Sequence, residues 1–230
     1  MIVQRVAAVR ERIARSASRA GRGEGEVTLV AVSKTHPPEA IREAFAAGVR
    51  DFGENKVQEA EKKVSALADL REKGLRWHMV GHLQANKAGK AVALFDRIHS
   101  IDDVELAPRL EKAAAERKKV ARVLLQVDLA REDTKFGLEE GRVLPALEAL
   151  RGMKSVRVEG LMVFPPYEAD PERARPFFRR LRELRDQARA RQLLLGDDLS
   201  MGMSHDLEVA VEEGATLVRV GTAVFGERAG

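Results

Sequence analysis

One lysine of this chain stands where a side-chain amine could do covalent chemistry. Lys34 comes directly after the apolar run of residues 29–33, so we expect it at the end of a buried strand. Partial desolvation would lower the pKa of its ammonium group, and the neutral amine could then attack an aldehyde carbon. A strand-end lysine that simply reaches solvent is the alternative, and position alone leaves both open.

Two segments near the C-terminus carry hydroxyl groups and glycines suited to an anion. Ser204 follows an apolar run and is expected to begin a helix, where its hydroxyl meets unpaired N–H groups. Gly221 would let a ligand approach the backbone closely, and Thr222 adds a second hydroxyl. Helix capping and a turn explain each residue alone, but both segments together indicate a phosphate site.

Two other groups of polar residues have the residue types of a metal site and of a catalytic triad, but their positions in the sequence favour neither. His78 and His82 are four residues apart, yet they fall on a strand end and a loop and have no third ligand nearby, so we predict no metal site. Ser204, His205 and Asp206 have the residue types of a hydrolase triad. Adjacent residues seldom converge on one reacting atom, so we predict no triad.

The elements that must position these residues alternate between strands and helices along the whole chain. The runs expected to form strands are residues 27–33, 49–53, 77–81, 97–101, 123–128, 158–164, 199–203 and 217–221. Helical periodicity is clearest at residues 2–20, 38–47, 104–118, 173–192 and 207–213. Such alternation is typical of an α/β protein with a parallel sheet.

Eight strand candidates in 230 residues favour a single-domain (β/α)8 TIM barrel. A doubly wound sheet has a glycine-rich turn after its first strand, whereas the glycines at 21–25 precede that strand. We therefore predict one domain over residues 1–230, with an extra N-terminal helix over 1–20 and the barrel over 27–226. In such a barrel the strand ends at Lys34, Ser204 and Gly221 share one face, where active sites and phosphates are found.

Composition narrows the class of protein further. The chain has no cysteine, which excludes disulfides and thiolate ligands, and its formal net charge is only +4. Acids and bases alternate, and in the basic segment 173–191 the spacing of Phe177, Leu181 and Leu184 indicates a helix with one buried face. No apolar run of about 20 residues and no secretory signal is present. We expect a cytoplasmic protein that binds neither nucleic acid nor membranes.

Several short motifs, in a fixed order, carry a resemblance over essentially the whole chain. The chain resembles the pyridoxal 5′-phosphate (PLP) homeostasis proteins, the YggS/PROSC family, which are similar to the N-terminal domain of alanine racemase. His82 stands where many family members have proline, which leaves the role of that loop open. The matching motifs are LVAVSKT (29–35), FGENxxQE (52–59), WHxxGxLQxNK (77–87), KxG (135–137), GLM (160–162), SMGMSxD (200–206) and VRVGTAVFG (218–226).

The resemblance implies a barrel like the N-terminal domain of alanine racemase, with PLP held as an internal aldimine on one lysine. It implies a role in PLP (vitamin B6) homeostasis and cofactor supply, with apo-enzymes that need PLP as possible recipients. The implied contacts are the aldimine on Lys34, the phosphate on Ser204, Gly221 and Thr222, the pyridine nitrogen near Arg219, and the pocket wall at Asn55.

Two arguments favour a carrier over an enzyme. Arginine keeps its proton, so Arg219 would donate to the ring nitrogen and leave it unprotonated, which makes PLP a weaker electron sink. Racemisation also needs a second base, which alanine racemase takes from a tyrosine of another domain. This chain ends at Gly230 and has a single tyrosine, Tyr167. We therefore expect a monomer without catalytic residues; the alternative is a PLP-dependent racemase or lyase with Lys34 as its base.

Overall fold

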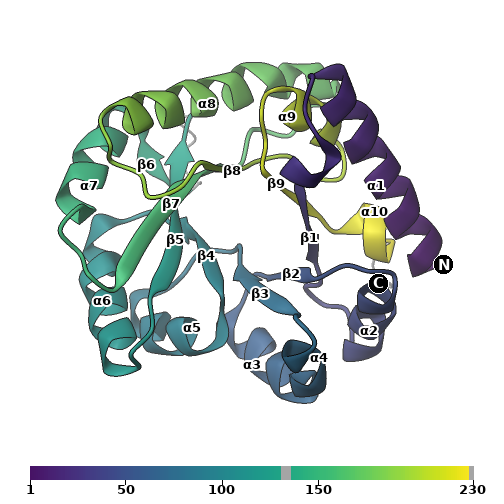
Figure 1. Ribbon diagram of the computed structural model, residues 1–230, viewed down its shortest axis with the longest axis horizontal. Coiled ribbons are helices and arrows are strands. Elements are labelled where there is room, and N and C mark those ends of the chain that lie inside the picture. The colour runs from purple at the N-terminus through teal and green to yellow at the C-terminus, as the bar shows by residue number, and fades with distance from the viewer. Residues whose placement is uncertain (131–135, 228–230) are drawn as a thin grey trace.

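Eight parallel strands close into a barrel in the computed structural model, which describes residues 1–130 and 136–227 (Figure 1). Each strand pairs with the next one around the barrel, and the last pairs with the first, so the barrel has no free edge. The barrel strands are β1 (Thr28–Val32), β2 (Asp51–Glu54), β3 (Arg76–Met79), β4 (Arg97–Ile101), β5 (Ala121–Asp128), β7 (Val156–Val163), β8 (Asp198–Ser200) and β9 (Leu217–Val220). The predicted (β/α)8 TIM barrel is confirmed, and all eight predicted strands form it.

Helices surround the barrel and connect successive strands (Figure 1). The α-helices are α1 (Ile2–Arg19), α2 (Pro38–Ala46), α3 (Val57–Ala66), α4 (Ala68–Glu72), α5 (Ala88–Leu94), α6 (Ala107–Glu116), α7 (Val143–Leu150), α8 (Arg175–Ala190), α9 (Leu207–Glu212) and α10 (Thr222–Phe225). Short 3-10 turns lie at η1 (Glu24–Glu26), η2 (Ala85–Lys87), η3 (Val104–Leu106), η4 (Glu140–Arg142) and η5 (Pro171–Ala174). The extra N-terminal helix α1 packs against α2, α9 and α10.

The structure differs from the sequence predictions in one added strand and in the starts of two helices. The two-residue strand β6 (Leu138–Glu139) pairs with β5 outside the barrel and was not predicted. The predicted helices 104–118 and 173–192 each begin as a 3-10 turn, with a proline near the start of the α-helix that follows. Proline is tolerated in the first turn of an α-helix because its missing N–H would have no partner there.

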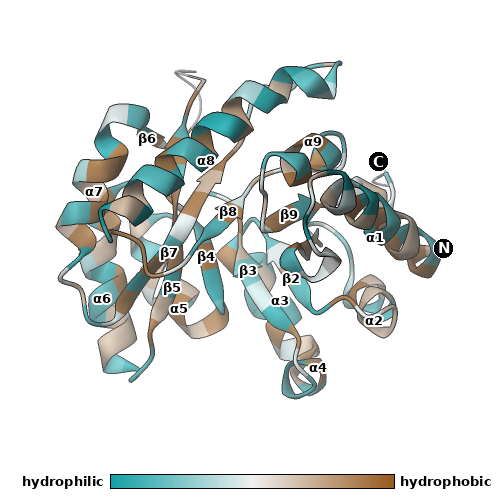
Figure 2. Cartoon of the chain, turned by 45° about the horizontal axis from the view of Figure 1, so that its top comes forward, coloured by the Kyte–Doolittle hydropathy of each residue, from teal (hydrophilic) through white to brown (hydrophobic). Residues whose placement is uncertain are grey.

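The buried face of α8 contains Phe178, Leu181 and Leu184, so the prediction that placed Phe177 there was off by one residue. The other face is rich in arginine, and hydrophilic colouring dominates this helix (Figure 2). These arginines are matched by acids: Arg175 and Arg179 both contact Glu213. The basic segment is thus a neutralised helix surface.

The barrel interior contains a small apolar cluster and a set of buried polar groups. Val30, Leu124, Met162 and Leu217 pack together, and Phe164 covers them. Most of the remaining apolar core lies in a larger cluster to which the strands and the surrounding helices contribute. Because side chains alternate along a strand, the inner face of β9 continues from Leu217 toward the site. In the described ranges, no helix is long and apolar enough to cross a membrane.

Candidate functional site

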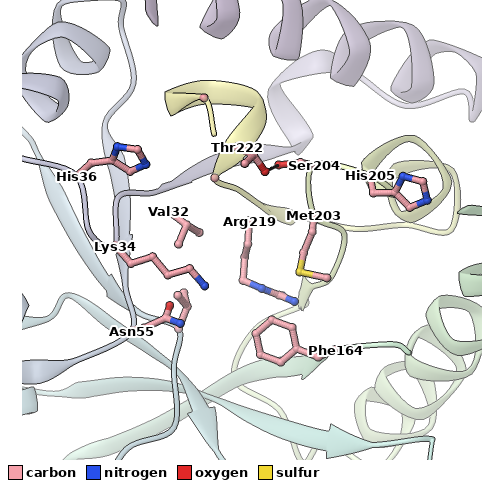
Figure 3. A pocket seen from close by; sticks show the side chains of 13 residues that line it. Val32, Lys34, His36, Asn55, Phe164, Met203, Ser204, His205, Arg219 and Thr222 are labelled. Atoms are coloured by element: carbon pink, nitrogen blue, oxygen red, sulfur yellow. Dashed lines mark hydrogen bonds between the residues drawn. The ribbon is translucent and has the colours of Figure 1, made fainter. Parts of the chain in front are cut away.

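A cavity of about 280 Å³ lies at the carboxyl ends of the barrel strands (Figure 3). The six residues singled out from the sequence all line it: Lys34, Asn55, Ser204, Arg219, Gly221 and Thr222. The side chain of Lys34 reaches from the end of β1 toward the centre of the cavity (Figure 3). The described residues that line this cavity include no acidic side chain, so its charged groups favour an anion.

The residues on both sides of Lys34 are held by a buried ion cluster. The Ser33 hydroxyl donates to Glu54 Oε1 at 2.6 Å, and the Thr35 N–H donates to Glu59 Oε1 at 2.6 Å. Thr35 has a φ of 67°, a conformation that a non-glycine residue adopts only when its surroundings hold it there. The lysine therefore starts from a fixed backbone.

Lys63 on α3 is the cation of that cluster. Its Nζ donates to the Ser33 carbonyl, to Glu54 Oε1 and to Glu59 Oε1, each at 2.7 Å. Only 5% of Lys63 is exposed. Burial raises the pKa of Glu54, and the bonds from Lys63 and Ser33 oppose that rise. The role of Lys63 could not be predicted from the sequence, because a lysine in a polar helix gives no sign of being buried.

Asn55 is placed by a close approach of two loops. A Cβ on Gly81 would lie 2.5 Å from the Asn55 carbonyl oxygen and 2.8 Å from its Cα, so only glycine fits there. The Ser100 hydroxyl donates to the Gly81 carbonyl at 2.5 Å and fixes the second loop. The glycine of the WHxxG motif thus has a packing role beside the site.

Arg219 on β9 is 2% exposed, and its side chain points into the barrel. Its Nη1 donates to Ser200 Oγ at 2.7 Å, its Nη2 donates to the Val163 carbonyl at 2.8 Å, and its guanidinium lies 4.3 Å from the centre of the Phe164 ring. Burial lowers the pKa of Arg219 to about 10, so it stays charged at neutral pH. Its buried Nε has no hydrogen-bond partner among the described residues.

The loop after β8 and the start of α10 meet at Ser204. Its Oγ accepts from Thr222 Oγ1 at 3.3 Å and from the Ala223 N–H at 3.2 Å. Asp206 holds the loop by accepting from the Met203 N–H at 2.6 Å, and burial raises the pKa of Asp206. Outside the loop, Arg12 of α1 donates to the Ser204 carbonyl at 3.0 Å.

Gly221 comes directly before Thr222 and lines the same cavity as the Ser204 and Thr222 hydroxyls. A Cβ at this position would come no closer than 3.5 Å to any neighbouring atom, the nearest being the Val32 carbonyl oxygen. The packing of the protein therefore does not require glycine here. A ligand that lies against the backbone at Gly221 would require glycine, because a Cβ would occupy the space that the ligand needs.

The other sequence candidates lie apart from this cavity or have different partners. His205 Nε2 bonds the Glu168 carbonyl at 3.0 Å while Asp206 binds a backbone N–H, so Ser204, His205 and Asp206 form no triad. Across residues 1–130 and 136–227 no group of three or more His, Cys, Asp or Glu side chains could hold a metal ion. Lys135 of the KxG motif lies outside the described residues.

A second cavity of about 420 Å³ adjoins the first and shares Phe164 and Met203 with it. His82 lines it, stacks on Phe136 with ring centres 3.8 Å apart, and bonds Asp102 through Nδ1 at 2.5 Å. Tyr167 also lines this second cavity and is 80% exposed. The single tyrosine is therefore not among the residues that line the Lys34 cavity.

Together these groups fit PLP. They offer an amine for its aldehyde and an unpartnered N–H donor at Arg219 for its ring nitrogen. For its phosphate they offer hydroxyls beside the free space at Gly221. The sequence also did not reveal the apolar wall, which includes Val32, Phe164 and Met203, because isolated apolar residues look like core in any strand.

Known proteins share this architecture and sequence. The family model of the alanine racemase N-terminal domain matches residues 5–229. A pyridoxal phosphate homeostasis protein of Aquifex aeolicus is 46% identical over 225 residues, covering 98% of this chain and 97% of the relative. PipY of Synechococcus elongatus PCC7942, solved with PLP bound, is 41% identical with a TM-score of 0.87 over 98% of this chain and 100% of that one.

A more distant structure shares the fold alone. Alanine racemase of Clostridium difficile 630 is 13% identical with a TM-score of 0.71, over 99% of this chain and 58% of the racemase. The barrel, the match to the family model and the identity to full-length relatives agree. The chain belongs to the alanine racemase N-terminal domain family and, within it, to the pyridoxal phosphate homeostasis proteins.

Proposed function

We propose that this protein binds PLP in the Lys34 cavity and serves PLP homeostasis, holding the cofactor and supplying it to apo-enzymes. The observation that carries the proposal is that an amine, a buried guanidinium with an unpartnered N–H, and a glycine with two hydroxyl-bearing residues line one cavity of about 280 Å³. This volume suits a small ligand. The Aquifex relative is named for PLP homeostasis, and PipY has been solved with PLP.

Each residue has a role in the proposal. The Lys34 amine would form a covalent link to the aldehyde carbon, with loss of water. Arg219 Nε would donate to the ring nitrogen, and Asn55 would form part of the wall. The Ser204 hydroxyl would donate its hydrogen to the phosphate, and the Thr222 hydroxyl would exchange its bond to Ser204 for one to the phosphate. Gly221 leaves room for it.

The carrier role is supported by what surrounds the ring. When bound, PLP supplies an electrophilic aldehyde and an electron-withdrawing ring. Arg219 keeps its charge and can only donate, so it would keep the ring nitrogen unprotonated and the electron sink weak. Tyr167 lines the neighbouring cavity, so it does not supply a second base from the wall of the first. The proposal treats residues 1–230 as one cytoplasmic, monomeric PLP-binding domain without a catalytic reaction.

The visible spectrum tests this proposal most directly. The purified protein should take up PLP and become yellow, and borohydride reduction followed by peptide mass analysis should place the label on Lys34. Lys34→Ala should lose the covalent absorbance band, whereas Lys56→Ala, an exposed lysine near Asn55, should keep it. A protein that takes up no PLP, or that carries the label elsewhere, would overturn the assignment.

Two further assays separate the carrier from the alternative enzyme. A carrier restores activity to an apo-enzyme when the loaded protein is added, faster than free PLP leaks from it. A racemase or lyase that uses Lys34 as its base exchanges the α-proton of an amino acid with solvent deuterium. Exchange of the α-proton in any member of a broad amino-acid panel would show that the protein is an enzyme and not a carrier alone.

A further inference from the structure

A continuous chain of buried hydrogen bonds crosses the barrel interior from Arg219 to Asp51. Arg219 Nη1 donates to Ser200 Oγ at 2.7 Å, and Ser200 Oγ lies 2.8 Å from His99 Nδ1. His99 Nε2 lies 2.9 Å from His78 Nδ1, and His78 Nε2 lies 2.9 Å from Asp51 Oδ1. All five residues are buried. They come from β9, β8, β4, β3 and β2, so the chain joins side chains that the sequence keeps far apart.

The far end of this chain reaches the opposite end of the barrel. Arg76 at the start of β3 donates to both carboxylate oxygens of Asp51, at 2.7 and 2.6 Å, and the side chain of Arg76 is 55% exposed. Burial alone would raise the pKa of Asp51, but the bonds from His78 and Arg76 outweigh it and hold the pKa well below the usual range. Asp51 is therefore an ionised acceptor at neutral pH.

An ionised acceptor at one end fixes the direction of the bond next to it. Asp51 can only accept, so His78 Nε2 carries a hydrogen. A neutral His99 ring donates through one nitrogen and accepts through the other, toward His78 on one side and Ser200 on the other. Whichever nitrogen of His99 carries the hydrogen, each bond of the chain has one donor and one acceptor, and Ser200 Oγ still accepts from Arg219 Nη1.

The surroundings of His99 favour its neutral state. His99 is fully enclosed, and burial lowers its pKa well below the usual value. The charged groups that face its ring are His78 from β3, Arg219 from β9 and Arg97 from β4, and they lower the pKa of His99 further.

We propose that Ser200, His99 and His78 are positioning residues that fix the donor pattern of Arg219 in the cofactor cavity. Ser200 and the Val163 carbonyl each accept one hydrogen from a terminal nitrogen and so fix the plane of the guanidinium, and the unpartnered Nε–H is then the donor for the ligand. The ligand of this donor is an unprotonated aromatic nitrogen, here the pyridine ring of PLP. The inference rests on the proposed function in that one respect; the hydrogen-bond chain itself is a property of the cofactor-free protein.

The first test needs no cofactor. Nitrogen-15 NMR of histidine-labelled, PLP-free protein at pH 7 reports which ring nitrogens carry hydrogen. We expect His99 to be neutral, with hydrogen on one ring nitrogen only. In Ser200→Ala the Nδ1 resonance of His99 should shift, because that nitrogen loses its hydrogen-bond partner, and in Ser16→Ala, another buried serine, it should not. A charged His99, or an Nδ1 resonance that does not move in Ser200→Ala, would overturn the inference.

The second test uses the loaded protein. Ser200→Ala and His99→Phe should each move the absorbance maximum of bound PLP and weaken its binding about tenfold, the effect of disturbing one charge-assisted hydrogen bond. Ser16→Ala should leave both unchanged. Wild-type spectra and affinity in both chain variants would overturn the inference and leave the proposed function intact. Failure of the wild-type protein to take up PLP would instead overturn the proposed function, while the NMR result would still stand.

Discussion

Two glycines beside Ser204 are present for opposite physical reasons. Gly202 has a φ of 90°, and a Cβ there would lie 2.5 Å from the Ala210 Cβ, so the fold itself requires glycine. Gly221 has a negative φ of −106°, and an added Cβ would find only ordinary contacts. The first glycine serves packing, and the second leaves space in the cavity.

Alanine substitutions should separate these two roles. Gly221→Ala should leave the thermal unfolding temperature of the PLP-free protein within about 2 °C of wild type and weaken PLP binding tenfold or more, because the methyl group takes the place of the phosphate. Gly202→Ala should lower the free energy of unfolding by about 2 kcal/mol through strain and overpacking. Calorimetry and PLP titration measure both. Equal PLP affinity in Gly221→Ala and wild type would contradict the placement of the phosphate.

His99 should make stability depend on pH in a narrow window. Its pKa is well below the usual value in the folded protein, whereas an unfolded histidine titrates near pH 6.5. The unfolded chain therefore binds more protons below about pH 6.5, and stability falls as the pH is lowered, on the order of 1 kcal/mol per pH unit. Asp51 contributes separately, since its stabilising charge is lost only below about pH 4.

Urea unfolding of the PLP-free protein between pH 5 and 6.5 measures this slope. His99→Phe should be less stable at pH 7 but should lose less stability on acidification than wild type. The comparison is between slopes, so other titrating groups cancel. The same slope in both proteins would show that His99 is protonated in the folded state.

At the scale of elements, the loop after β1 depends on a charge supplied by α3. Lys63 binds Glu54 and Glu59, and these carboxylates hold Ser33 and Thr35 on either side of Lys34. Removing the cation would leave Glu54 buried without its partner, which costs several kcal/mol in comparable pairs. The reactive amine and the fold are thus stabilised by the same cluster.

Lys63→Met should therefore affect both stability and cofactor uptake. We expect the free energy of unfolding to fall by about 3 kcal/mol and covalent PLP uptake to slow, because the backbone of Lys34 is no longer fixed. Lys62→Met, its exposed neighbour on α3, is the matched control and should change neither. Denaturant unfolding and stopped-flow absorbance report the two effects. Unchanged uptake kinetics in Lys63→Met would show that the cluster serves stability alone.

How far the sequence predicts these elements depends on how local their signals are. The barrel strands were predictable because short segments with apolar residues alternate with helical periodicity along the chain, and Lys34 stood out because it follows one of the most apolar of these segments. Phe177 and Phe178 are adjacent, so the sequence alone could not show which of the two side chains of α8 faces the core without the position of the preceding turn. Lys63, His99 and Ser200 carry no local signal, since their burial and partners arise only when distant strands meet in the barrel.

At the scale of the whole molecule, α1 supports the site from outside the barrel. It packs against α9 and α10, beside which it lies in Figure 1. Arg12 donates to the Ser204 carbonyl and pairs with Glu208 at 2.6 Å, and Arg5 donates to the Phe225 carbonyl at 2.9 Å. The added helix thus braces both segments expected to hold the phosphate.

Arg12→Leu should loosen this support without touching the cavity. We expect PLP affinity to fall about fivefold, the effect of losing roughly 1 kcal/mol of hydrogen bonding that holds the Ser204 loop in place. Arg15→Leu removes an exposed arginine of α1 whose partner is Glu11, and it should leave affinity unchanged. Fluorescence titration with PLP distinguishes the two variants. Equal affinities would confine the role of α1 to stability.

The pairing of the first and last barrel strands has a mechanical consequence. Lys34 extends from the end of β1, whereas Arg219, Gly221 and Thr222 come from β9 and its continuation, so a molecule bound to both groups would span the junction at which the barrel closes. Separating β1 from β9 would then break one of the two attachments of that molecule. Ligand binding and barrel closure would therefore stabilise each other, and release of the ligand would weaken the pairing of β1 with β9.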